Sequence, residues 1–499
     1  MFNWYFASGD LEFFWADKIQ SLSWLPNVFR RDLGFGFDTL LSLWLEYPFR
    51  LLIKILSTVG LSWFVIEKLL WLAVFAIAVY SSHKLTKSWI APIIYAANTY
   101  IVLLFTGGQL GVAFAYALAP LVLFTFTQKN VIGNGLWFAL LVACDLRIAY
   151  LILGAIMLYY VVEKKSNYVF PLFQSLGVAA SVHLYWILPT ILASRGTASL
   201  GEQFTNPGML KFLSFADFSH ALSLLHPNWP ENLFGKIYFL QPEFLVIPIV
   251  AFAALLFRDK KIRFFALLAL IGVFFAKGVN GPFGGVFSWM FTHVPGFVMF
   301  RDPTKFYILS AIGYSVLIPF VLKKLNKPVF YILFAFFWIC TLRGIHIVTA
   351  ELPREYRELK NMLSADTVPS RTLWIPQKEN FAFYSDTHPI VTATDAAAID
   401  PSVKYVIVPI DVAHRIFLNN YAFDPSIRAR LVAQLTAVFP RNTSFSDLAV
   451  FENPNFTTMR VAVPADANRQ QNLANIGVGI SAGFLVLWSL WLFFTRSSL

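Results

Sequence analysis

Phe297-Val-Met-Phe-Arg-Asp-Pro-Thr-Lys-Phe306 leads from a polar loop into an apolar run at 304–322, and places two cations and one carboxylate at that boundary. A charged side chain in or beside a membrane span is costly unless it is paired, hydrated or bound to a ligand. Arg301, Asp302 and Lys305 are therefore candidates for a binding site. The alternative interpretation is an Arg301–Asp302 ion pair, with Lys305 extended toward the lipid headgroups.

The composition predicts a helical membrane protein. Of 499 residues, 57% are hydrophobic, 17% aromatic and only 13% charged, about half the charged share of an average soluble domain. Helices are expected because lipid offers no partners for bare backbone groups. The net charge of +11 comes from Lys and Arg in short connections between apolar runs, so nucleic acid is not an expected partner. The two cysteines, Cys144 and Cys340, indicate neither a metal site nor a disulfide framework.

We predict about eleven transmembrane helices, because runs near the roughly 20 apolar residues needed to cross a bilayer recur along the chain. They lie at approximately 63–82, 88–106, 110–127, 131–144, 146–162, 168–192, 241–257, 263–277, 304–322, 328–348 and 474–494. Alternate connections carry the basic residues, namely Lys84, Lys87, Lys129, Lys164, Lys165, Arg258, Lys260, Lys261, Arg263, Lys323, Lys324, Lys327 and Arg496. By the positive-inside rule, these connections are cytoplasmic and the large polar segments lie outside.

Four parts are expected on this basis. Residues 1–62 form a first extracytoplasmic loop with interfacial helices, and 63–348 form the transmembrane core. Residues 349–473 have the composition of a small extracytoplasmic α/β domain, and 474–499 hold a closing transmembrane helix. Strands are predicted at 371–376, 403–409 and 448–452, and helices at 351–360 and 425–439. An outer N-terminal loop also leads us to expect a further helix before Met1, the alternative being translocation of the tail driven by span 63–82.

The first outer loop contains Ser8-Gly9-Asp10-Leu11-Glu12. Glycine before an acid allows a tight turn that can aim the carboxylate of Asp10 into a cavity; the alternative is a solvated turn. Asp32 is a rival, because Arg30 and Arg31 beside it could hold it ionised. Asp17 and Asp38, in the same loop, are weaker rivals.

Two other outer segments carry candidate residues. In the loop 193–240, Trp229 and its asparagine neighbours suit sugar stacking and hydroxyl binding, and His226 lies close by; a loop packed on the membrane surface is the alternative. Arg301 and Lys305 suit the phosphate of a lipid carrier, because arginine donates two hydrogen bonds and lysine is a compact charge. Asp145 and Arg147, between two short spans, form a mutual salt bridge or line the same cavity.

These features together resemble GT-C-type membrane glycosyltransferases, nearest to the YfhO-like proteins and the cell-wall arabinofuranosyltransferases. The resemblance lies in the Gly-Asp of the first outer loop, the many spans, the Phe-Arg-x-Pro-x-Lys-Phe-type motif at 300–306 and the late α/β domain before a closing helix. It implies transfer of a sugar from a polyprenyl-phosphate carrier to a glycan, lipid or protein acceptor outside the cytoplasmic membrane of a prokaryote. It also implies that Asp10 is the catalytic base and that Arg301 and Lys305 meet the carrier phosphate.

The expected chemistry is a single displacement that inverts the anomeric centre, with a carboxylate as base and cations neutralising the departing phosphate. A divalent metal could assist, but the outer loops contain no Asp-x-Asp and no metal site is predicted. Membrane lipid is the surrounding partner. Two alternatives stay open: a transporter or flippase of lipid-linked glycans, and an inactive scaffold in a glycan-assembly complex.

Overall fold

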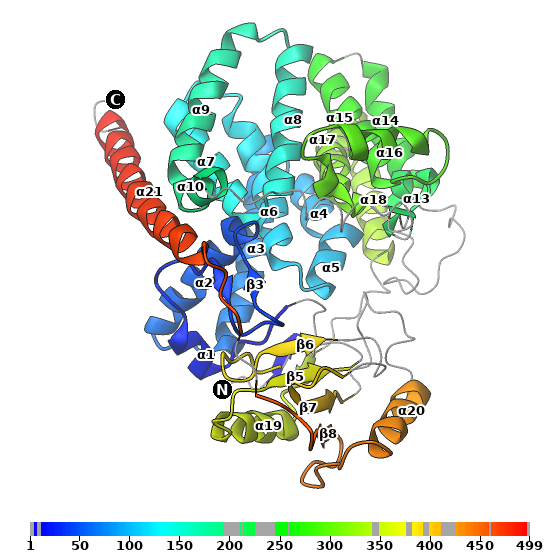
Figure 1. The fold of residues 1–499 in the computed structure, drawn as a ribbon. Coiled ribbons are helices and arrows are strands. Elements are labelled where there is room, and N and C mark those ends of the chain that lie inside the picture. Colours follow the sequence, from blue (N-terminus) through cyan, green and yellow to red (C-terminus); the bar gives the residue numbers. More distant parts are fainter. Residues whose placement is uncertain are drawn as a thin grey trace.

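The computed structural model describes residues 4–6, 11–192, 210–211, 213–214, 216–224, 245–257, 259–341, 349–375, 382–392, 399–410, 425–458 and 461–496. Most described residues are helical (Figure 1). The helices of the N-terminal half are α1 (Ala16–Ser21), α2 (Leu43–Thr58), α3 (Trp63–Thr86), α4 (Ile90–Ala96), α5 (Thr99–Thr106), α6 (Leu110–Thr125), α7 (Val131–Cys144), α8 (Leu146–Val162), α9 (Val169–Val182) and α10 (Leu184–Leu192).

The later helices are α13 (Phe218–Leu224), α14 (Val246–Ala253), α15 (Lys260–Ala276), α16 (Gly284–His293), α17 (Tyr307–Leu325), α18 (Pro328–Thr341), α19 (Arg354–Ala365), α20 (Pro425–Thr436) and α21 (Ala467–Arg496). Single 3-10 turns are η1 (Ser166–Tyr168), η3 (Ala254–Phe257), η4 (Phe297–Phe300) and η5 (Pro303–Phe306). The strands are β1 (Trp4–Phe6), β2 (Phe29–Arg30), β3 (Phe37–Asp38), β4 (Thr349–Glu351), β5 (Arg371–Trp374), β6 (Ile390–Thr392), β7 (Val403–Val408) and β8 (Ala449–Glu452).

Glycines bring α15 and α17 together at the centre of the bundle. A Cβ on Gly272 would lie 2.6 Å from the backbone nitrogen of Ser310, and a Cβ on Gly313 would lie 2.8 Å from the carbonyl oxygen of Phe265. Small residues allow such close backbone approach between apolar helices. Because α17 continues directly from η5, this packing also places the 301–306 turn at one end of the bundle.

Among the described residues, three helices are long and apolar enough to cross a bilayer: Trp63–Thr86, Pro303–Leu325 and Ala467–Phe494. The predicted span 168–192 is present as α9 and α10, which are bent by 86° at the break. The predicted span 88–106 is two short helices, because Asn98 accepts the backbone N–H groups of Tyr100 and Ile101 and so begins a new helix. The count of eleven spans stays a prediction.

The basic connections meet at one end of the helical bundle. Leu85, Gln128, Lys165 and Lys260 line one cavity there, so the connections after α3, α6 and α8 and before α15 are neighbours. The starts of α6, α8 and α17 lie at the other end, on the side of the β-strands (Figure 1). Four of the predicted basic connections therefore lie together, whereas the side of a membrane that they face stays a prediction.

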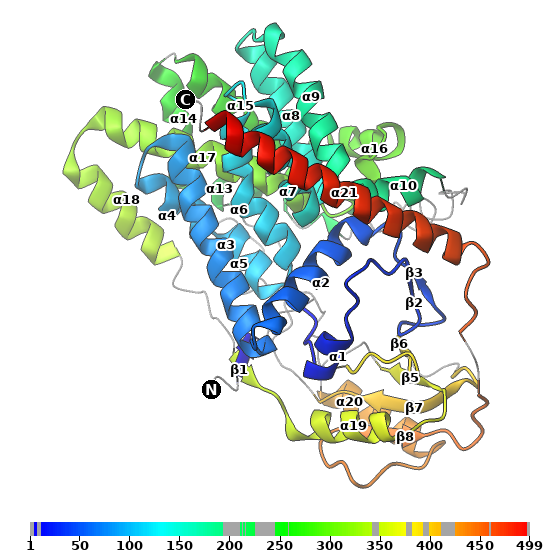
Figure 2. The same ribbon diagram turned by 90° about the vertical axis from the view of Figure 1, so that its left-hand side faces the viewer.

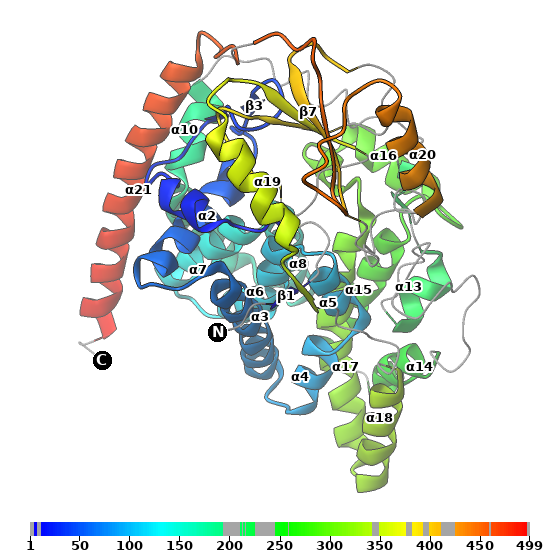
Figure 3. The same cartoon turned by 90° about the horizontal axis from the view of Figure 1, so that it is seen from below.

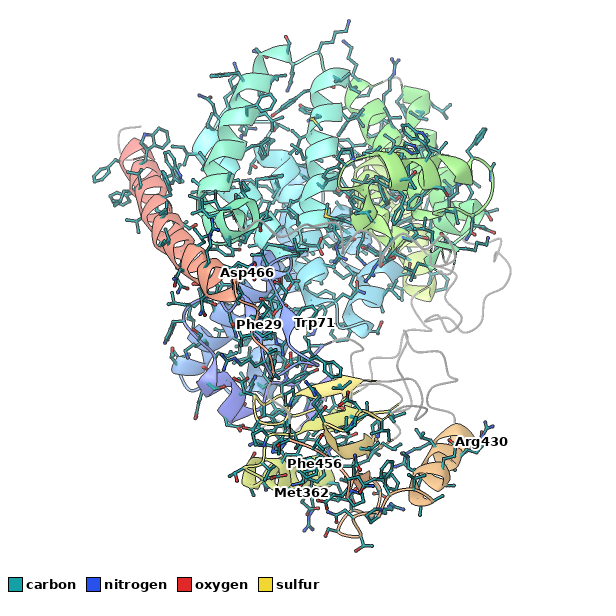
Figure 4. All side chains as sticks on the ribbon, viewed as in Figure 1. Phe29, Trp71, Met362, Arg430, Phe456 and Asp466 are labelled. Carbon is teal, nitrogen blue, oxygen red and sulfur yellow. The ribbon has the colours of Figure 1, made fainter. Side chains whose placement is uncertain are left out.

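The segment after α18 contains a four-stranded sheet of order β6-β5-β7-β8. β5 pairs in parallel with β6 and β7, whereas β8 is antiparallel to β7. The three predicted strands are confirmed as β5, β7 and β8, and β6 is an addition. Figure 4 labels Met362 and Phe456 in this part and Trp71 in α3, where the Trp71 ring lies 4.7 Å from that of Phe105.

Segments from the start of the chain join this sheet to the bundle. β1 pairs antiparallel with β4, and the backbone N–H of Phe6 donates to the buried carboxylate of Glu67 on α3. Leu33 forms a parallel bridge with Ile390, so residues 32–34 extend the sheet beyond β6. α1 consequently lies close to α19 and the sheet edge (Figures 2 and 3).

Candidate functional site

The turn from η4 to η5 holds the first half of a charged cluster, which we define as Asp145, Arg147, Arg301, Asp302 and Lys305. Asp302 begins η5 because its carboxylate accepts the N–H and hydroxyl of Thr304 at 3.0 and 2.6 Å. The ammonium of Lys305, which is 2% exposed, donates to Asp302 at 2.5 Å and to Gln109 at 3.1 Å. Arg301 is exposed. Only one of the two predicted phosphate-binding cations is thus presented at the surface of this turn.

The start of α8 holds the second half. Asp145 is fully buried and begins the helix by accepting the N–H groups of Arg147 and Ile148 at 2.8 and 3.1 Å. The guanidinium of Arg147 also grips this carboxylate, with Nη2 2.6 Å and Nε 3.1 Å from its oxygens. The predicted mutual salt bridge is confirmed. The side chain of Arg147 is 31% exposed.

The two halves lie within electrostatic reach of each other. Burial lowers the pKa of Arg301, the positive charge of Arg147 lowers it further, and the carboxylate of Asp302 opposes both. The phenol of Tyr100 is fully buried and lies in the fields of Asp302, Asp145 and Arg147. No residue in the described ranges forms a hydrogen bond with its hydroxyl. Three cations and two carboxylates give the cluster a net charge of +1.

A hydrogen-bonded aromatic core supports the cluster from inside the bundle. The rings of Tyr95 and Tyr116 stack at 4.2 Å, and each hydroxyl donates to the other's carbonyl oxygen at 2.6 Å. The amide of Asn98 donates to the Tyr116 hydroxyl at 2.8 Å. Tyr100 packs edge-on against Tyr116 and tilted against Tyr307, the first residue of α17. Buried polar groups that are bonded in this way rigidify the helices that carry the cluster.

The other predicted site residues do not join this cluster in the described part of the chain. Asp10, His226 and Trp229 lie outside the described residues. Asp32 is buried between Arg30 at 2.9 Å and Lys18 at 2.7 Å. Burial alone would raise the pKa of Asp32, but the hydrogen bonds and charges of Arg30 and Lys18 hold it well below its ordinary value. The expectation that arginine keeps Asp32 ionised is supported, with Arg30 as the arginine.

Sequence reasoning did not single out Gln109, Tyr100 or the adjacent Glu67 and Lys68. Glu67 is 1% exposed, and Lys68 donates to the carbonyl oxygen of Trp4 at 2.7 Å, so both hold the start of the chain against α3. Glu67 and Lys68 are two charged residues inside the apolar run 63–82, so the sequence itself marks them as candidates for a specific role. Tyr100 and Gln109 carry no comparable signal.

Among the described residues, no three His, Cys, Asp or Glu side chains are grouped as metal ligands.

The bundle has apolar helices long enough to cross a membrane and a small sheet at one end, and its similarity to a solved structure supports a GT-C-like fold. The fold is similar to that of one cryo-EM structure of mycobacterial arabinofuranosyltransferase AftD, and a second class of the same mutant was also matched. One class is 13% identical with a TM-score of 0.51, and the other 12% identical with a TM-score of 0.49. Each match covers 93% of this chain and 40% of AftD. No protein-family model and no curated protein matches the sequence.

Proposed function

We propose that this protein is a membrane glycosyltransferase that takes a sugar from a polyprenyl-phosphate carrier. The observation that supports the proposal is that Arg147 and Arg301, from distant segments, lie within electrostatic reach of each other where α8 packs against η5. Like charges held together at the end of an apolar bundle fit an anionic ligand whose remainder is hydrophobic. The GT-C-like fold supports the same conclusion.

In the proposed mechanism, Arg301 and the partly exposed Arg147 bind the carrier phosphate, while Lys305 holds the turn through Asp302. Asp10 removes the proton of an acceptor hydroxyl as its oxygen attacks the anomeric carbon. The bond from that carbon to the phosphate oxygen breaks, and the two guanidiniums neutralise the charge on the departing phosphate. One displacement inverts the anomeric centre.

The substrates follow from the same proposal. Arabinofuranose is the first donor sugar to test, because the fold is shared with an arabinofuranosyltransferase. The acceptor is a glycan, lipid or protein at the outer face of a prokaryotic cytoplasmic membrane, where a cytosolic nucleotide sugar would be out of reach. The cluster and the sheet lie at the same end of the bundle, opposite the basic connections, which supports this placement.

The test is turnover of radiolabelled polyprenyl-phosphate sugars by the full chain in nanodiscs. We expect Arg301→Gln to lower kcat/KM by about 10²–10³, the usual cost of losing a donor to developing charge. Arg301→Lys should recover part of it, because charge returns without the planar fork. Asp10→Asn should abolish transfer. Arg354→Gln, at a highly exposed position in α19, is the control. Wild-type rates in Arg301→Gln, or lipid flipping without transfer, would contradict the proposal.

A further inference from the structure

A second pocket lies away from the charged cluster, between the first loop and the α/β part of the chain. It has a volume of about 490 Å³, within the range of pockets that hold small molecules. α1 contributes Asp17 and Lys18, α2 contributes Glu46 and Arg50, and the segment before β6 contributes Asp386. Two separate parts of the chain therefore have to be in place for the pocket to exist.

The docking of these parts is specific. The N–H of Gly34 donates to the carbonyl oxygen of Ile390 at 2.6 Å, and the N–H of Ile390 donates to that of Asp32 at 3.2 Å. Lys360 on α19 forms an ion pair with Asp17 at 2.9 Å. These bonds hold the segment before β6 against the first loop, so that residues 383–386 line the same pocket as residues of α1 and α2. The pocket is thus a product of the fold.

The charges around the pocket are balanced. Within the described residues, Lys18 and Arg30 pair with Asp32, Arg50 pairs with Glu46 at 3.4 Å, and Lys360 pairs with Asp17. The lining itself thus carries three cations and four carboxylates, and Lys360 on α19, which pairs with Asp17 from outside the lining, supplies the fourth cation. A phosphate would require excess positive charge and a metal ion excess carboxylate. The lining has no excess of positive charge, and among the described residues no three of its acidic side chains are grouped as metal ligands, but it offers many hydrogen-bond donors and acceptors.

Aromatic rings complete the lining. Tyr384 is buried, with the guanidinium of Arg30 5.3 Å from its ring centre, and Phe383 is half-buried beside Lys360. Tyr47 on α2 also faces the pocket, with its hydroxyl bonded to the carbonyl oxygen of Trp24. Paired polar groups that both donate and accept, together with ring faces, suit a ligand rich in hydroxyl groups and without net charge.

We infer that this pocket binds a neutral oligosaccharide, which is the acceptor of the reaction. The acceptor role rests on the proposed function. The charged cluster, which is proposed to bind the carrier phosphate, is positively charged. The pocket, which is proposed to bind the glycan, has cations and carboxylates that pair with one another. The α/β part of the chain contributes one wall, so it recognises polymer without supplying a reacting group.

Two variants of the full-length protein test the inference. Arg50→Gln removes one charge and several donors from the lining. Ser21→Trp, at an exposed position at the end of α1 that lines the pocket, fills it while leaving every ion pair intact. The matched control is Arg354→Gln, which breaks an i,i+4 pair with Glu358 like that of Arg50 with Glu46, but on the exposed surface of α19. Size-exclusion profile and melting temperature check folding.

Binding is measured first, by saturation-transfer-difference NMR with neutral di- to tetrasaccharides, with acidic oligosaccharides and inorganic phosphate as competitors. We expect neutral oligosaccharides to bind the wild type and the control alike, and both pocket variants to weaken binding at least about tenfold, which is 1.4 kcal/mol. Absence of binding to the wild type, equal binding by folded variants, or preference for acidic ligands would overturn the inference.

Kinetics separates this inference from the proposed function. With a polyprenyl-phosphate sugar as donor, both pocket variants should raise the KM for acceptor at least tenfold more than the KM for donor. If the wild type binds oligosaccharide in the pocket but turns over no lipid-linked sugar, the proposed function fails and the binding site stands. If transfer is normal and neither folded pocket variant changes the acceptor KM, the site fails and the function stands.

Discussion

Lys305 and Arg301 are four positions apart and have the same charge, yet the structure gives them different surroundings. The ammonium of Lys305 is buried between Asp302 and Gln109, whereas Arg301 is exposed beside Arg147. A buried ammonium that is already paired gains little from a further ligand, and its removal leaves a carboxylate without its counter-charge. Lys305 is therefore a positioning residue in the proposed site, and Arg301 is the group that meets phosphate.

This difference predicts a stability effect for Lys305 and a binding effect for Arg301. Lys305→Met should lower the melting temperature, because Asp302 loses its cation, and Asp302→Asn added to it should recover part of the loss. The coupling energy between Lys305 and Asp302 should be about 0.5–3 kcal/mol, as it is for contacting residues in general. Arg301→Gln should lower the melting temperature less than Lys305→Met does, because Arg301 is exposed and Lys305 is buried. A double mutant no more stable than Lys305→Met would show that the pair does not hold the turn.

A pH effect is expected in the α/β part, at Asp366. Burial alone would raise the pKa of Asp366, but hydrogen bonds from Lys404, the N–H of Val368 and the hydroxyl of Tyr405 lower it below its ordinary value. A carboxyl group with a lowered pKa stabilises the folded state above its ordinary value of 3.8 and loses that contribution as the pH falls through the folded value.

Hydrogen–deuterium exchange of the full chain should show this loss at β5 and β7. We expect Asp366→Asn to reduce protection there at neutral pH by about 1–3 kcal/mol, the range for hydrogen bonds to a charged group. The difference between wild type and variant should begin to shrink as the pH falls below about 3.8, and should vanish only below the lowered pKa of the folded state. A difference that stays constant with pH would show that the charge of Asp366 is irrelevant.

At the scale of elements, the approach of α15 to α17 sets the position of the charged turn. A Cβ at Gly272 meets backbone atoms of Ser310 and Phe306 within 3.0 Å, so the helices themselves must move apart. Gly272→Val should lower the free energy of unfolding by about 1–3 kcal/mol through overpacking. It should also lower transfer activity, because η5, which carries Lys305, leads directly into α17. Gly154→Ala is the matched control.

Gly154 lies in α8 with no heavy atom within 4 Å of an added Cβ, leaving out the helix's own backbone. Alanine there should raise stability by about 0.5–1 kcal/mol through helix propensity alone. Melting of both variants in detergent, followed with a thiol-reactive dye, compares them directly. Equal behaviour of Gly272→Val and Gly154→Ala would mean that α15 and α17 tolerate separation.

Helices and strands that neighbouring residues determine were predictable from the sequence. Features that depend on contacts between distant segments were not. The β-branched run of β7 and the helical spacing of α20 depend on nearest neighbours only. The break between α4 and α5 depends on Asn98 bonding to the backbone rather than lying inside a span. The salt bridge of Asp145 with Arg147 was foreseeable from two positions in one turn. Its approach to Arg301 required the packing of α8 against η5.

At the scale of the whole molecule, the bundle has two chemically different ends. One end carries the lysine-rich connections, and the other carries the charged cluster, the balanced pocket and the sheet. The cluster suits a phosphate and the pocket a neutral glycan, so both proposed ligands approach from one side. That arrangement suits transfer between a lipid carrier and a polymer in the same compartment, because neither substrate has to cross the membrane.

Sidedness can be tested by labelling single cysteines in intact cells, after Cys144 and Cys340 are replaced by alanine. We expect a membrane-impermeant maleimide to label Arg354→Cys on α19 directly, and to label Lys129→Cys, in a basic connection, only after permeabilisation. Both positions are exposed. The opposite pattern would place the cluster in the cytosol, where nucleotide sugars are available and a polyprenyl-phosphate donor is unnecessary. The assignment of Arg301 to a lipid-linked phosphate depends on this result, since the charge of the cluster alone fits either donor.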